Sequence, residues 1–121
     1  MAEKKAIRVA ASAERMALPE EQGSQAWLAN ESLTGASLSV IRLTLRPGQS
    51  GGTHRHPNAD EVICLFQGTV RVHTPAEAIL LQPGDGLTVP AGLTHQIENV
   101  GNEEAEMSLS YSSGDRRYVA E

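Results

Sequence analysis

From residue 37 onward, apolar and polar positions follow the short, interrupted pattern of an all-β protein. Runs of β-branched and apolar residues are broken at close intervals by glycine, proline, asparagine or aspartate. The expected strands lie at 38–45, 61–66, 69–73, 78–81, 87–89, 94–97 and 106–111. No segment of useful length beyond residue 37 has the apolar period of about 3.6 residues that a helix needs. Many short strands bounded by turns predict a sandwich or a barrel.

The same pattern divides the chain into three parts. Residues 36–112 carry the strands, and we expect them to form one barrel domain, as a length of 121 residues allows. Residues 1–35 show no clear period. We expect them to form a strand or an arm that packs on the barrel or on a partner subunit. Residues 113–121 are expected to be a C-terminal tail.

Composition narrows the class of function. The net charge of −5 and the few aromatic side chains argue against nucleic acid as a partner and against an anionic lipid surface. No apolar run reaches membrane-spanning length, and Arg8 interrupts the only N-terminal stretch that resembles a signal peptide, so we expect neither feature. The single cysteine, Cys64, allows no internal disulfide and suits a reducing compartment, so the expected location is cytoplasmic.

The histidines are the first residues that indicate chemistry. His54 and His56 are separated by one residue, so on an extended chain both imidazoles lie on one face and can converge on a metal ion. A carboxylate follows, and its identity depends on the backbone. Glu61 reaches the histidine face if the chain bends at the Pro-Asn pair after His56, whereas Asp60 reaches it if the chain runs straight. The bend signal favours Glu61, although an isolated His-x-His pair is a weak motif.

Two spaced motifs between residues 48 and 99 are more specific. The first consists of Gly48, His54, His56, Glu61 and Gly68, separated by five, one, four and six residues. The second consists of Gly84, Pro90, Gly92, His95 and Asn99, separated by five, one, two and three residues. Every fixed position of the two cupin motifs is filled, so the chain resembles a small single-domain cupin of the conserved-barrel type. Residues 54–62 are also similar to the metal-binding stretch of germins, which are manganese cupins.

The resemblance implies a fold and a site. The fold is the cupin barrel, a double-stranded β-helix or jelly roll. The metal ligands are His54, His56, Glu61 and His95, which settles the carboxylate as Glu61 rather than Asp60. The glycines, the proline and the asparagine of the motifs are implied to be turn and barrel-closing residues. The resemblance leaves the activity open, because cupins include dioxygenases, oxalate-degrading enzymes, isomerases, lyases and sugar-binding regulators.

Three imidazoles and one carboxylate suit one divalent ion per chain, namely Mn, Fe, Ni or Co in octahedral geometry, with Zn as an alternative. Four protein ligands leave two octahedral positions open for water, dioxygen or an anionic oxygen donor. We therefore expect a metal-dependent enzyme, an oxidoreductase of the dioxygenase type, that acts on a small anionic or carbonyl-bearing molecule. Two alternatives remain: a non-catalytic binding or sensory protein, and a metal-dependent sugar-acid isomerase or lyase. No catalytic residue beyond the metal centre is identified.

Strand parity predicts the wall of the substrate pocket. Side chains two residues after an inward-facing ligand face inward as well. Arginine on the strand at 38–45 is a candidate for reaching a substrate carboxylate, and tyrosine on the strand at 106–111 is a candidate for the pocket mouth. The expected pocket residues are Ile63, Leu65, Ile97, Arg42 and Tyr111.

The opposite face of the strand at 61–66 is apolar too. Val62, Cys64 and Phe66 share the outward parity, and a monomeric barrel would expose them. We expect them to be covered by a second subunit. Small cupins commonly dimerise, so the resemblance also implies a homodimer.

Overall fold

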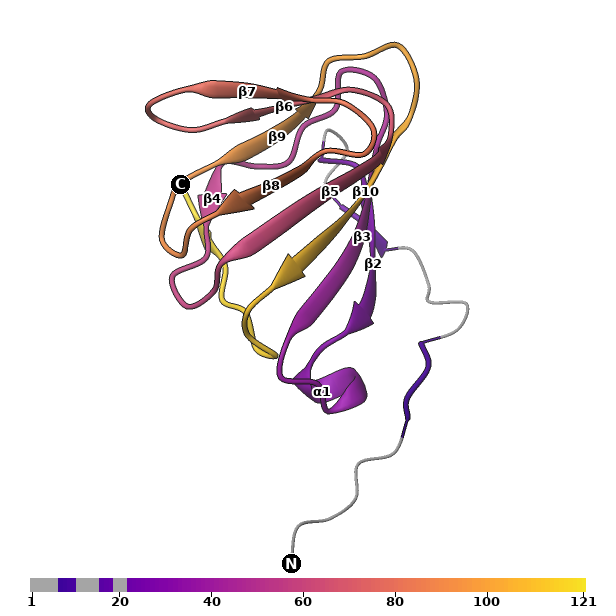
Figure 1. The fold of residues 1–121 in the computed structure, drawn as a ribbon, viewed down its shortest axis with the longest axis vertical. Helices are drawn as coiled ribbons and strands as arrows, with labels where there is room; N and C mark the ends of the chain where they lie inside the picture. The colour runs from indigo at the N-terminus through magenta and orange to yellow at the C-terminus, as the bar shows by residue number, and fades with distance from the viewer. Residues whose placement is uncertain (1–6, 11–15, 19–21) are drawn as a thin grey trace, which may run out of the picture.

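The computed structural model describes residues 7–10, 16–18 and 22–121. The regular secondary structure of this part of the chain is almost entirely strand, which confirms the all-β prediction (Figure 1). The strands are β1 (Met16–Ala17), β2 (Ser24–Ala29), β3 (Ser39–Leu45), β4 (His54–Arg55), β5 (Glu61–Gln67), β6 (Val70–His73), β7 (Ala78–Leu81), β8 (Gly86–Val89), β9 (Gln96–Asn99), β10 (Ala105–Tyr111) and β11 (Val119–Ala120). A short helix, α1 (Glu31–Thr34), connects β2 to β3 and is capped by Asn30, whose side chain accepts a hydrogen bond from the Leu33 amide.

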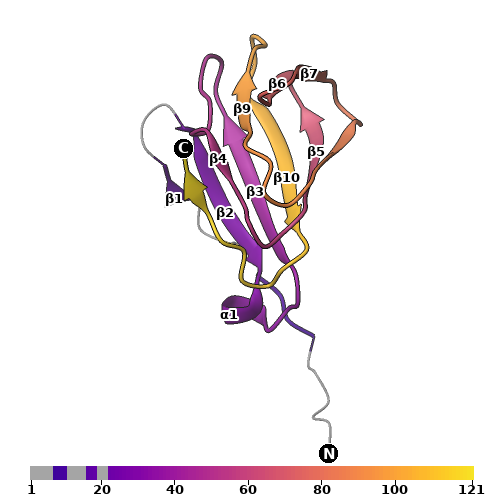
Figure 2. The same ribbon diagram turned by 90° about the vertical axis from the view of Figure 1, so that its left-hand side faces the viewer.

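Antiparallel pairing arranges the strands in a jelly roll (Figures 1 and 2). The larger sheet has the order β1-β2-β3-β10-β5-β8, and the smaller sheet has the order β7-β6-β9. β4 pairs with β11, and two isolated bridges, Ser50–Glu98 and His54–His95, tie the segment that contains β4 to the segment that contains β9. The fold is the double-stranded β-helix that the two motifs imply.

Side-chain alternation along the long strands places the core inside the barrel. On β5, Ile63 and Leu65 are buried while Val62 and Phe66 are exposed, the latter with 65% of its surface accessible. β10 shows the same alternation, and its buried residues face those of β3 and β5 across the ladder. The outward parity expected for Val62 and Phe66 is therefore observed. The largest fully buried apolar residues are Ile41, Leu45, Ile63, Leu65, Val70, Val72 and Met107.

The segments on either side of the predicted barrel domain both contribute to it. β2 lies alongside β3, from Ser24 opposite Thr44 to Ala29 opposite Val40, so part of residues 1–35 extends the larger sheet. Residues 7–10 are largely exposed and form no strand. The segment 113–121, expected to be a tail, returns to the barrel and pairs through β11 with β4. The C-terminal segment therefore forms part of the wall next to two of the predicted ligands.

Two motif residues have clear structural roles. Asn99 donates hydrogen bonds from its amide nitrogen to the carbonyls of Leu45 and Glu103, both at 2.9 Å, and accepts one from the Gly101 amide. Gly68, in the turn between β5 and β6, has φ of +86°, and a Cβ built there would lie 2.8 Å from the Cα of Ala105. Only glycine fits that turn without strain.

Candidate metal centre

The local backbone places the four predicted ligands on one side of the barrel wall. His54 and His95 bond to each other through both amides and both carbonyls, at 3.0 and 2.8 Å, and residues paired in this way point their side chains to one face. His56 follows two residues after His54 and shares that face. The chain then turns at the Pro-Asn pair, and Glu61 enters β5 facing inward. Asp60 instead faces solvent, where its Oδ1 accepts a hydrogen bond from the Ala91 amide.

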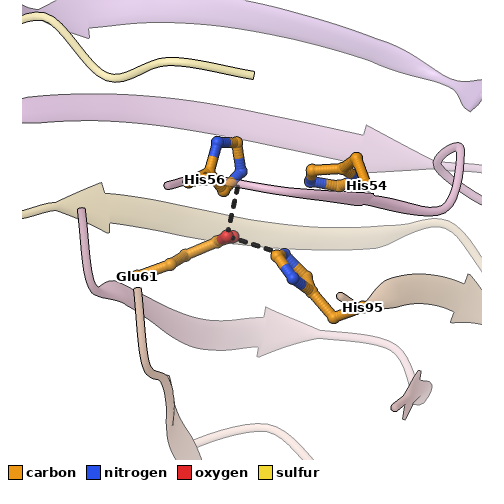
Figure 3. Close-up of side chains that lie close together, drawn as sticks. All are labelled: His54, His56, Glu61 and His95. Carbon is orange, nitrogen blue, oxygen red and sulfur yellow. Dashed lines mark hydrogen bonds and ion pairs between the residues drawn. The ribbon is translucent and has the colours of Figure 1, made fainter. Parts of the chain in front are cut away.

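The four side chains form one compact, mostly buried cluster (Figure 3). One candidate ligand atom from each residue lies within 4.8 Å of the others. His56, Glu61 and His95 are 1–2% exposed, and His54 is half-buried at the edge of the cavity. A cluster of this size and composition fits the space that a single metal ion occupies. The bend that favours Glu61 over Asp60 in the sequence is present.

Backbone carbonyls orient all three imidazoles in the same way. His54 Nδ1 faces the carbonyl of Gly52 at 2.5 Å, His56 Nδ1 that of Arg117 at 2.7 Å, and His95 Nδ1 that of Leu93 at 2.9 Å. A carbonyl only accepts hydrogen bonds, so each Nδ1 carries the proton and each neutral ring has its lone pair on Nε2. Metal-bound histidines are held by this arrangement of the second ring nitrogen.

Two of these Nε2 atoms face the same carboxylate oxygen. His95 Nε2 lies 2.9 Å and His56 Nε2 lies 3.4 Å from the same oxygen of Glu61, Oε1. Neutral nitrogen lone pairs facing a carboxylate oxygen require a cation between them, either a proton or a metal ion. Within the described residues, His56 Nε2 and Glu61 Oε2 are also buried without a hydrogen-bond partner. Buried polar atoms are rarely left in that state, so the residues fit a divalent metal ion.

Burial and charge shift the pKa values of these groups in opposite directions. Burial lowers the pKa of His54 from 6.5 to about 4. Burial would raise the pKa of Glu61, but its contacts with His56 and His95 outweigh burial and lower the pKa to about 2. For His95, burial acts to lower the pKa, and the adjacent Glu61 carboxylate reverses the sign and raises it. The cluster therefore holds an ionised carboxylate beside imidazoles, the state in which these groups bind metals.

A cavity of about 440 Å³ opens onto His54 and Glu61. Ile97 and Tyr111 line it, as parity predicts. Ile63 and Leu65 face inward but are packed in the core and are not among the lining residues. Arg42 was predicted wrongly: its neighbours on β3 are buried, so it points to the outer face, where it is exposed and pairs with Glu106 at 2.9 Å.

Several cavity residues come from segments without a sequence motif. Trp27 of β2 and Arg116 and Tyr118 of the C-terminal segment line the cavity. The Tyr118 ring stacks on the His54 imidazole, with centroids 4.5 Å apart and planes 17° apart. Buried Tyr111 lies edge-on to His56, and burial together with the Glu61 charge raises its pKa well above 10. The clustering of two of the few aromatic residues with arginines after residue 110 is the only signal in the sequence that points to this wall.

The jelly roll and the inward-facing His₃Glu cluster, which could hold a metal ion, together define a barrel of the cupin type. A family model for the cupin domain matches residues 41–111, and the chain belongs to the cupin family. This assignment confirms the resemblance carried by the two motifs. None of the helices within the described ranges has the length and apolar character needed to cross a membrane.

Among curated relatives, the tetracenomycin polyketide synthase protein TcmJ of Streptomyces glaucescens is 33% identical over 91 residues, which cover 74% of this chain and 61% of that protein. The polyketide synthase CurC of Streptomyces cyaneus is 35% identical over 79 residues, 64% of this chain and 51% of its own. An oxalate-binding protein of Thermotoga maritima is 29% identical, with 65% of each chain covered. The chain thus spans about half to two thirds of the length of these relatives.

Solved structures give the same fold. A recombinant oxalate oxidase in complex with glycolate superposes with a TM-score of 0.75 at 22% identity, covering 84% of this chain and 56% of that one. An oxalate decarboxylase of Bacillus subtilis superposes with a TM-score of 0.77 at 23% identity, covering 85% of this chain and 29% of that one. At these sequence identities the similarity establishes the barrel fold alone.

Proposed function

We propose that the protein is a metal-dependent cupin enzyme of the dioxygenase type that acts on a small anionic or carbonyl-bearing molecule. One divalent ion per chain, Mn, Fe, Ni or Co with Zn as an alternative, is held by His54, His56, Glu61 and His95. The observation that carries the proposal is the convergence of three imidazoles and the Glu61 carboxylate beside a cavity large enough for an organic molecule. A divalent ion with adjacent open positions orients dioxygen or polarises a substrate carbonyl.

The chain's own residues supply binding and exclusion of water. Leu43, Ile97 and Leu109 give the cavity an apolar wall that favours the carbon skeleton of a substrate. Tyr111 keeps its phenolic proton, because burial and the Glu61 charge raise its pKa, so it acts as a hydrogen-bond donor and not as a base. The carbonyls behind the three imidazoles hold the rings in place for the ion.

A second candidate is a binding protein that retains an anion at the metal without converting it. It is favoured by the lack of an acid–base pair: among the described lining residues, Glu61 is the only carboxylate and it belongs to the ligand set. The relative from Thermotoga maritima is named as an oxalate-binding protein, which is a protein of this class.

Oxygen-electrode assays on Mn²⁺- and Fe²⁺-loaded protein would distinguish these candidates. A panel of carboxylates, diketones and phenols is offered with and without oxygen, and the metal-free His95→Ala variant is the control. We expect oxygen consumption that requires the metal. Turnover without oxygen would support an isomerase or lyase. Tight binding with no product would support the second candidate, a non-catalytic binding protein.

We further propose that the protein is a homodimer. Val62 and Phe66 are exposed on the outer face of β5, next to half-buried Cys64. An apolar patch of this kind on a sheet is typical of a subunit contact.

A further inference from the structure

The cavity contains a cation that the ligand set does not use. Arg116 enters from the C-terminal segment, and its guanidinium carbon lies 5.0 Å from the ring centre of Trp27, 4.9 Å from Tyr111 and 5.7 Å from Tyr118. Three rings within about 6 Å hold a guanidinium by cation–π attraction. The arginine is therefore fixed in the cavity wall.

The Arg116 side chain has unused hydrogen-bonding capacity within the described residues. Its Nε is buried without a hydrogen-bond partner, and no carboxylate within the described residues forms an ion pair with it. A guanidinium has five N–H donors in a planar fork that matches a carboxylate or another oxyanion. Aromatic faces compensate part of the charge but accept no conventional hydrogen bond, so the donors are available to a ligand.

The charge balance of the cavity favours an anion. Among the lining residues that the structure describes, Glu61 and Arg116 are the only ones that carry a full charge at neutral pH. A divalent ion at the ligand set would more than offset the Glu61 carboxylate. The loaded cavity then carries positive charge at the ion and at Arg116.

The two positive centres lie close enough for one molecule to reach both. The centre of the Tyr111 ring lies 4.8 Å from that of His56 and 4.9 Å from the guanidinium carbon of Arg116. The centre of the Tyr118 ring lies 4.5 Å from that of His54 and 5.7 Å from the same carbon. The guanidinium therefore shares an aromatic neighbour with each of these two imidazoles. The volume of about 440 Å³ lies in the range of pockets for organic ligands of many atoms and far exceeds the roughly 30 Å³ share of a water molecule.

We propose that Arg116 sets the specificity of the site by binding the oxyanion of an amphipathic organic anion whose other end reaches the metal. The ligand class is an aryl or similarly extended apolar carboxylate or enolate, larger than a two-carbon diacid. The apolar body lies against Leu43, Ile97 and Leu109. This inference rests on the proposed function, because the second contact of the ligand is the bound ion.

Fluorescence of Trp27 provides the test, since it is the only tryptophan in the chain and lines the cavity. Mn²⁺-loaded protein is titrated with naphthoate and with naphthamide, which has the same shape but no charge. The variants are Arg116→Gln and, as a matched control on the outer face, Arg42→Gln. Metal content is measured for every sample before titration, and each titration is repeated on metal-free protein.

We expect naphthoate to bind wild-type protein at least about tenfold more tightly than naphthamide, as a charge-assisted hydrogen bond provides. Arg116→Gln should remove that preference with its metal content unchanged, while Arg42→Gln retains it. Equal binding of the two probes by wild-type protein would overturn the inference. So would a naphthoate preference that survives in Arg116→Gln, because the carboxylate would then bind the ion alone. A wild-type protein that takes up no metal would instead refute the proposed function.

Discussion

His56 donates its Nδ1 proton to the carbonyl of Arg117, 2.7 Å away and 61 positions further along the chain. This bond links a predicted metal ligand to the C-terminal segment that completes the cavity wall. Tyr118, the next residue, stacks on His54. The end of the described chain is thus coupled to two of the four ligands through backbone and ring contacts, and the metal centre is supported by more of the molecule than the two motifs contain.

Deletion of residues 117–121 should weaken metal binding by about 10- to 100-fold, the usual effect of losing a partner that orients a metal-bound histidine. His56 would lose its acceptor and His54 its stacked ring. Competition with a fluorescent chelator measures the affinity. Deletion of residue 121 alone is the control, since the Arg117 carbonyl, Tyr118 and the pairing of β11 with β4 remain. Equal affinity of both deletions, with intact circular dichroism spectra, would contradict the supporting role of the segment.

Removal of single ligands should abolish metal binding. Protein that has never met a nickel column should carry about one divalent ion per chain by elemental analysis. His54→Ala and Glu61→Ala each remove one of only four protein donors and leave a buried, incomplete set, so both should contain almost none. Asp60→Ala is the matched control, because Asp60 lies beside Glu61 in sequence but faces solvent. Loss of metal in Asp60→Ala with retention in Glu61→Ala would reverse the assignment of the carboxylate.

Metal should be lost as the pH falls below about 6, because the ligand imidazoles must be neutral. The His95 pKa is raised by Glu61, so this ring takes up a proton before His54 does, and the proton competes directly with the ion. The His54 pKa is lowered to about 4, so His54 remains neutral through most of that range. Each proton that the imidazoles take up lowers the affinity for the metal further, so metal binding weakens as the pH falls. Equilibrium dialysis at a series of pH values is the measurement, and full retention at pH of about 4 would count against a mainly histidine site.

The positions that the sequence predicts well are those fixed by local rules. Alternation decides which residues of β5 face inward, and the Pro-Asn turn after His56 brings Glu61 round to the histidine face. Both depend on neighbours in the chain. The prediction for Arg42 was wrong because the direction in which a single polar side chain points depends on which of its strand neighbours are buried in the core. Arg116 was missed because its position depends on the return of the C-terminal segment to the barrel, which brings it against Trp27 of distant β2.

Glycine substitutions should separate backbone strain from steric clash. Gly68 and Gly84 are both motif glycines with positive φ, +86° and +95°. A Cβ at Gly84 meets nothing within 4 Å, whereas one at Gly68 meets the Cα of Ala105 at 2.8 Å. Gly84→Ala should therefore cost about 1 kcal/mol from the left-handed backbone alone. Gly68→Ala should cost at least about 1 kcal/mol more, because main chain must move. Urea unfolding of the metal-free proteins measures both, and equal costs would show that the β5–β6 turn relaxes freely.

Phe66→Glu should convert the proposed homodimer into a monomer. The side chain is 65% exposed on the outer face of β5, and a charge there would have to be buried, without a partner, in any contact that covers the patch. Leu80→Glu is the control: Leu80 is also exposed, at 46%, but it lies on β7 in the other sheet. Light scattering coupled to gel filtration should give a dimer for the wild type and Leu80→Glu, and a monomer for Phe66→Glu. A monomeric wild type would refute the dimer, and a dimer that persists in Phe66→Glu would place the interface on a different face.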